Sequence, residues 1–143
     1  MSTIVYPYLV TIIVAWFGAH LIKYIILKIK KERPDLKTLL FVSGGMPSSH
    51  SATSVALLTI IGLRDGTDSG LFGIAALFAM IVMHDAVRVR RSTGEQGAVL
   101  QALIQKLKSK IVPPPIIKGH TLMEVVVGAG LGLVIGVIVH ILT

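Results

Sequence analysis

Long apolar runs separated by short polar segments form the main pattern along this chain. Three runs are long enough to cross a hydrocarbon core of about 30 Å: they cover about residues 4–29, 71–87 and 122–142. A shorter helical run, from about Ser49 to Leu63, follows the polar segment at residues 43–50. Because this fourth run is short for a full span, we expect a partly re-entrant loop before it.

A different periodicity marks residues 98–112. Val99, Leu103 and Leu107 recur one helical turn apart, and lysines decorate the remaining positions. This pattern is typical of an amphipathic helix that lies in the membrane interface. The segments together predict an all-α membrane bundle of about four transmembrane helices plus one interfacial helix. We expect a single domain over residues 1–143.

The composition is that of a protein solvated by lipid. Hydrophobic residues make up 53% of the chain and charged residues only 15%, whereas about 25% charged residues is usual for a soluble domain. The mean hydropathy is +0.80. The chain contains no cysteine, which excludes disulfides and thiolate metal sites.

The distribution of positive charge predicts an orientation. The formal net charge is +7, and with four spans all of the 14 Lys and Arg residues except Arg64 fall on one side. By the positive-inside rule this side is cytoplasmic, and both termini lie outside. The basic residues stand beside apolar runs and aromatic residues make up only 6% of the chain. This argues against a nucleic-acid partner and favours membrane lipids.

A glycine- and serine-rich segment at residues 44–50 predicts an anion site on the cytoplasmic side. Gly45 lets backbone amides turn inward without obstruction by a Cβ atom. Ser48 or Ser49 can cap the following helix, whose N-terminus attracts anions. The alternative is an ordinary capped turn. We favour a phosphate site because His50 follows directly and arginines lie on the same side.

Arg90 and Arg91 are candidate phosphate ligands, because guanidinium groups bind phosphate oxygens in a bidentate manner. Anchoring by positive charge explains part of this basic cluster. Asp85 can orient an arginine about one helical turn later. Alternatively, Asp85 joins His84 in a metal site, although the spacing is not that of a usual zinc motif.

His120 and Glu124 are four residues apart at the start of the last apolar run, so they face the same way on a helix. A carboxylate beside an imidazole fixes its tautomer and stabilises its cation. A histidine paired in this way can act as a nucleophile. The alternative is a polar pair at headgroup level without a chemical role.

Gly128, Gly132 and Gly136 leave one face of the last predicted helix nearly smooth. A neighbouring backbone can approach such a face closely. We expect the neighbour to be a helix of the same chain, and the alternative is a second copy in a homo-oligomer.

The strings SGGMPSSHSA, HDAVRVRRSTGEQ and GHTLMEVVVGAGLG together resemble the divergent, short branch of the type-2 phosphatidic acid phosphatase superfamily, which is related to the vanadium haloperoxidases. The resemblance covers roughly residues 20–135. It implies that His120 is the nucleophile that forms a phosphohistidine. It further implies that Glu124 supports this histidine and that His50 protonates the leaving oxygen.

The same resemblance implies that Ser48, Ser49 and the loop amides bind the phosphate together with Arg90 or Arg91. It implies no metal or other cofactor. In this chain 28 residues separate Arg91 from His120, where the superfamily has five, and glutamate stands where the superfamily has aspartate.

The first signature of the superfamily, Lys-x6-Arg-Pro, is not intact here. Lys23, Lys30 and the pair Arg33-Pro34 are present, but at other spacings. Lys23 is our candidate for the phosphate contact of that signature.

These inferences predict an integral membrane lipid phosphatase that hydrolyses a phosphomonoester or pyrophosphate of a lipid on the cytoplasmic side. A scaffold that binds lipid headgroups without turnover is the first alternative. A small oligomeric transporter is the second, but the polar residues collect at one face of the membrane instead of lining a path through it.

Overall fold

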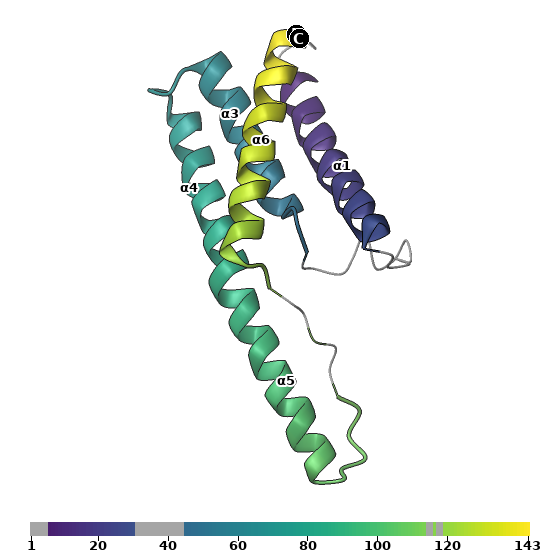
Figure 1. Cartoon of the computed structure of the whole chain (residues 1–143). Helices are drawn as coiled ribbons and strands as arrows, with labels where there is room; N and C mark the ends of the chain where they lie inside the picture. The colour runs from purple at the N-terminus through teal and green to yellow at the C-terminus, as the bar shows by residue number, and fades with distance from the viewer. Residues whose placement is uncertain (1–5, 31–44, 114–115, 117–118) are drawn as a thin grey trace.

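Helices account for nearly all of the residues that the structure describes, which are 6–30, 45–113, 116 and 119–143 (Figure 1). In this computed structural model the helical segments are α1 (Tyr6–Ile29), α3 (Ser49–Asp65), α4 (Gly70–His84), the π-helical turn η1 (Asp85–Val89), α5 (Arg90–Lys106) and α6 (Leu122–Leu142). The described residues contain no strand. The prediction of an all-α membrane bundle is confirmed.

Helix α3 is the centre of the bundle, because α1, α4 and α6 all pack against it. Where α3 faces the glycines of α6 its side chains are small: Ala52 and Ala56 are fully buried. A Cβ atom on Gly132 would overlap the carbonyl oxygen of Ala52, and one on Gly136 would crowd that of Ala56. The smooth face of α6 is therefore occupied by α3 of the same chain, which is the intramolecular alternative that we favoured.

Apolar side chains cover the outside of the bundle. Large exposed examples include Phe17 on α1, Phe78 on α4 and Leu133 on α6. Such extensive exposed apolar surface is unusual in water and normal in lipid. Three stretches have the length and hydropathy of a membrane span: Tyr6–Ile29, the continuous helix Gly70–Lys106 and Leu122–Leu142. The 17 residues of α3 make it shorter, as the sequence indicated for that run.

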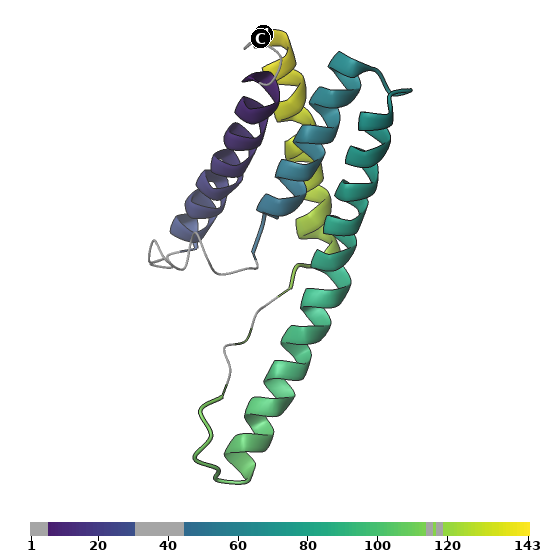
Figure 2. The same ribbon diagram turned by 180° about the vertical axis from the view of Figure 1, so that it is seen from behind.

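The predicted interfacial helix is placed differently from our expectation. Helix α5 begins at Arg90, well before residue 98, and ends at Lys106, before residue 112. It continues the direction of α4 through η1 and projects beyond the ends of the other helices (Figures 1 and 2). The physical reason is that no proline interrupts the sequence between α4 and α5, so helical bonding persists from one to the other.

Candidate functional site

Four segments meet at the end of the bundle where α1 ends and α3 and α6 begin, which we call the site end (Figure 1). The backbone N–H of Ser48 donates to the carbonyl oxygen of Glu124 at 3.1 Å. The backbone N–H of His120 donates to the carbonyl oxygen of Ala86 at 3.0 Å. These two bonds tie the serine loop to α6 and the start of α6 to η1, so they fix the relative positions of the predicted site residues.

The serine loop caps α3. The Ser48 hydroxyl oxygen accepts from the Ser51 N–H at 3.4 Å and from the Ser51 hydroxyl at 3.0 Å, and Ser48 is fully buried. The Ser48 hydroxyl therefore caps the N-terminus of α3. Ser49, the next residue, is also buried. The first-turn amides of Ser49 and His50 make no hydrogen bond to other described residues, and first-turn amides of a helix can bind an anion.

The predicted pair of His120 and Glu124 is present. Nδ1 of His120 lies 3.0 Å from Oε2 of Glu124. Because a carboxylate only accepts, Nδ1 carries the proton and Nε2 keeps its lone pair. The same Glu124 oxygen accepts from the Thr121 N–H at 3.2 Å, and the Thr121 hydroxyl accepts from the Glu124 N–H at 3.3 Å. This capping box fixes the carboxylate that orients the histidine.

His120 is 2% exposed. Burial lowers the pKa of His120 below its usual value and outweighs the bond to Glu124, which raises that pKa. The charges of Lys23 and Arg90 act in the same direction as burial. His120 is therefore neutral at neutral pH, which is the form that a nucleophile requires.

His50 lies on the first turn of α3 and is exposed. Arg90 and Lys23 act on its imidazole with their positive charges, and His120 and His20 are close enough to do so when protonated. His50 and His120 are thus neighbours at one end of the bundle, although they are 70 residues apart in sequence, and Arg90 and Lys23 act on both. This is the arrangement expected of a site that binds an anion between them.

Arg90 acts electrostatically on both histidines, and Arg91 lines a cavity together with His120. Nε of Arg90 lies 2.6 Å from Oδ2 of Asp85. Residues five apart point about 140° away from each other on an α-helix, but η1 has the wider π-helical turn, which brings them together. Asp85 therefore orients an arginine, as one of the two sequence interpretations proposed. Among the described residues, no three His, Asp or Glu side chains form a metal cluster around it.

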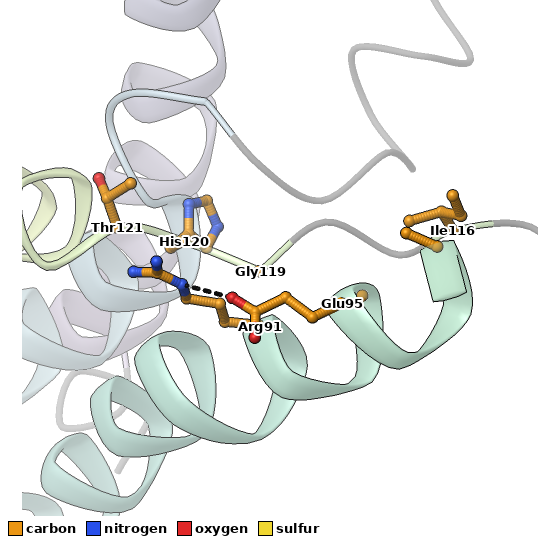
Figure 3. Close-up of a pocket in the computed structure, with 8 residues that line it drawn as sticks. Arg91, Glu95, Ile116, Gly119, His120 and Thr121 are labelled. Carbon is orange, nitrogen blue, oxygen red and sulfur yellow. Dashed lines mark hydrogen bonds and ion pairs between the residues drawn. The ribbon is translucent and has the colours of Figure 1, made fainter. Parts of the chain in front are cut away.

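Arg91 lies beside His120 and Thr121 and pairs with a second carboxylate (Figure 3). Its Nε pairs with Oε1 of Glu95 at 3.1 Å. The two side chains line one wall of a cavity of about 430 Å³, with His120 and Thr121 near the wall's end (Figure 3). Ile116, from the chain that returns alongside α5, lies at the other end of the cavity.

The segments of Arg91 and His120 are far apart in sequence but lie close together in the structure. A Cβ atom on Gly119 would overlap the backbone nitrogen of Arg91. The segment that carries Arg91 and the segment that carries His120 are therefore in contact, although 28 residues separate the two side chains in sequence.

Lys23 projects from α1 into the same end of the bundle. It is only 6% exposed, and its side chain makes no ion pair or hydrogen bond to the described residues. Together with Lys30, Gly45 and Glu124 it lines a cavity of about 310 Å³. A buried, unpaired cation facing a cavity is well placed to bind an anion. Arg33-Pro34 falls outside the described residues.

His20 lies three residues before Lys23, so both side chains share one face of α1. Nδ1 of His20 lies 2.8 Å from the carbonyl oxygen of Trp16, and its ring packs at a tilt against that indole with 4.2 Å between centroids. His20 also acts electrostatically on His50. His20 was not among the candidates named from the sequence, and its spacing from Lys23 is the signal that points to it.

These features define a class: a helical membrane protein with a carboxylate-oriented histidine, a second histidine and basic side chains gathered at one end of its bundle. The sequence model of the Divergent PAP2 family matches residues 5–135, and the chain belongs to this family. The prediction of a divergent branch of the type-2 phosphatidic acid phosphatases is confirmed.

A relative in Bacillus subtilis (strain 168), the "Uncharacterized membrane protein YuiD", is 51% identical over 67 residues. The match covers 47% of this chain and 42% of that protein, so the matched part is less than half of the relative's length. No solved structure matches the chain.

Proposed function

We propose that this protein is an integral membrane phosphatase that hydrolyses a phosphomonoester or pyrophosphate of a lipid through a phosphohistidine. One observation carries the proposal: Glu124 holds His120 in the tautomer that presents Nε2, and His50, Arg90 and Lys23 stand around it. Membership of the Divergent PAP2 family supports the same reaction class.

In the first step, Nε2 of His120 forms a bond to the phosphorus atom while the bond to the leaving oxygen breaks. Protonated His50 gives its proton to that oxygen, so the lipid departs as an alcohol, or as a phosphate if the substrate is a pyrophosphate. In the second step, water attacks the phosphohistidine and gives a proton to His50. Inorganic phosphate leaves, and both histidines return to their starting states.

The anion-binding groups have separate tasks in this proposal. Arg90, fixed by Asp85, offers terminal nitrogens to the equatorial phosphate oxygens. Lys23 adds a point charge from α1, and the amides of Ser49 and His50 add donors at the start of α3. These groups stabilise the negative charge that builds up in the transition state.

The site lies where a lipid phosphate would be found. Residues of the site end stand at the boundary between the apolar helices and the polar segments that follow them. We propose that this end faces the cytoplasm, because the basic side chains gather there. A lipid can then present its headgroup while its acyl or prenyl chains stay in the bilayer.

The decisive experiment compares phosphate release by the wild type and by His120→Ala from phosphatidate and a polyprenyl phosphate, with and without chelator. We expect release by the wild type in both conditions and a loss of roughly a thousandfold or more in the variant. His84→Ala is the matched control, because His84 is exposed and lies outside the site. Equal release by the wild type and His120→Ala would overturn the proposal.

A scaffold that only binds headgroups would give a different result in the same panel. Such a protein would retain lipid phosphates on the full chain, yet would release no phosphate from any of them. Acid-labile phosphate on the protein, present in the wild type and absent in His120→Ala, separates turnover from binding.

A further inference from the structure

A second group of basic side chains lies at η1 and the start of α5, beside the proposed catalytic centre. Arg88 and Arg91 share one cavity of about 490 Å³, whereas Arg90 is not among the residues that line it. Its lining residues are Val87, Arg88, Arg91, Ser92, Glu95 and Leu122. The cavity thus has two guanidinium groups, one hydroxyl and an apolar floor.

The described residues that line this cavity carry two positive charges and one negative charge. Arg88 makes no ion pair or hydrogen bond to the described residues, and it is exposed. Arg91 uses its Nε for Glu95, which leaves both terminal nitrogens as donors. Two guanidinium groups facing one carboxylate give a net positive cavity, and such groups are suited to bidentate contacts with phosphate oxygens.

The cavity lies at the level where the apolar helices α4 and α6 meet the polar segments, and this position indicates what kind of molecule would bind there. Leu122, at the cavity wall, is the first residue of α6, and Arg88 follows α4 by one turn. On the apolar side of this level, Ile81 and Val126 are exposed on α4 and α6. A phospholipid places its phosphate at such a boundary and its acyl chains along the apolar helices. A free anion would make no favourable contact with the apolar side chains of the wall, Val87 and Leu122.

We propose that Arg88, Arg91 and Ser92, above Leu122, form a binding site for the headgroup of an anionic phospholipid that is not turned over. The site is separate from the cluster around His120, with Arg91 as the side chain that borders both cavities. A lipid bound there anchors the junction between α4 and α5 at the membrane surface.

The test is binding of lipid to the full chain in detergent, measured by native mass spectrometry. His120→Ala is the common background, so that turnover plays no part and failure of the proposed phosphatase activity would not affect the result. We expect phosphatidylglycerol to bind more tightly than zwitterionic phosphatidylcholine. Arg88→Gln should weaken phosphatidylglycerol binding by roughly tenfold, which corresponds to the loss of one charge-assisted contact.

Lys106→Gln is the matched control, because it removes the same charge from the far end of α5. Unchanged binding by Lys106→Gln alongside weakened binding by Arg88→Gln supports the site. Equal weakening by both variants would show attraction by net charge alone and overturn it. Displacement of phosphatidylglycerol by inorganic phosphate at equal concentration would also overturn it, because the site would then recognise a free anion.

Arg88→Lys provides a second variant that keeps the positive charge. Because an ammonium group cannot reproduce the bidentate geometry of a guanidinium group, its affinity for phosphatidylglycerol should lie between those of the wild-type Arg88 and Arg88→Gln. Helical content measured by circular dichroism shows that each variant retains the fold.

Discussion

The contact between α3 and α6 and the projecting helix α5 are opposite extremes of packing in one small protein. In the first, glycines on α6 bring two backbones together, and Ala52 and Ala56 are fully buried. In the second, Val99 and Leu103 are exposed, and Gly94 is the buried residue of the whole helix. The comparison indicates that the site depends on the α3–α6 contact, which carries His50 and His120, and much less on α5.

The α3–α6 contact should therefore be the most sensitive part of the molecule. Gly132→Leu would force its side chain into the Ala52 carbonyl, and we expect a loss of stability of about 3 kcal/mol or more. Thermal unfolding of the full chain in detergent measures the change. Gly130→Leu is the matched control, because nothing lies within 4 Å of a Cβ atom at that position. Equal melting temperatures for the two variants would contradict the described packing.

The site that this contact supports should respond to changes that leave the fold intact. Glu124→Gln keeps the shape of the side chain but removes the charge that stabilises the histidine cation. We expect phosphate release to fall roughly a hundredfold, because the amide no longer fixes the productive tautomer. Release by the wild type and by Glu124→Gln, measured across a pH series, gives both the rate and its pH dependence.

The direction of the pH effect follows from the neutral form being the active one. Burial holds the pKa of His120 below its usual value, so the acidic limb of the wild-type activity profile should lie below about pH 6.5. Glu124 raises that pKa, and its removal therefore lowers the pKa further. The acidic limb of the Glu124→Gln profile should lie at lower pH than that of the wild type. A shift to higher pH would show that another group controls the limb.

Much of the fold followed from the sequence, because apolar length and helical spacing act locally. The apolar runs predicted the helices α1, α4 and α6. The spacing of four residues predicted that His120 lies beside Glu124. The path of α5 was not visible, because an amphipathic pattern indicates which face is apolar but not where the helix points.

The identity of the arginine that Asp85 orients could not be predicted from the sequence either. A regular α-helix puts Asp85 and Arg90 on different sides, and only the π-helical turn brings them together. Such a turn leaves a carbonyl without a partner in its own helix, since i→i+5 bonding skips one acceptor. The Ala86 carbonyl accepts from the N–H of His120. A bond between residues so distant in sequence has no local signature.

The smallest effect expected from the comparison concerns a pair of valines. Val125 on α6 is 3% exposed and Val99 on α5 is 69% exposed. Val125→Ala should lower stability by on the order of 1 kcal/mol, because packing contacts are lost and a small cavity remains. Val99→Ala should change stability by less than about 0.5 kcal/mol, because the Val99 side chain is largely exposed and alanine has a higher helix propensity than valine. Thermal unfolding of both variants in the same detergent tests the pair. A larger loss for Val99→Ala than for Val125→Ala would mean that α5 packs against a surface in the folded protein, and the contrast between the two regions would then fail.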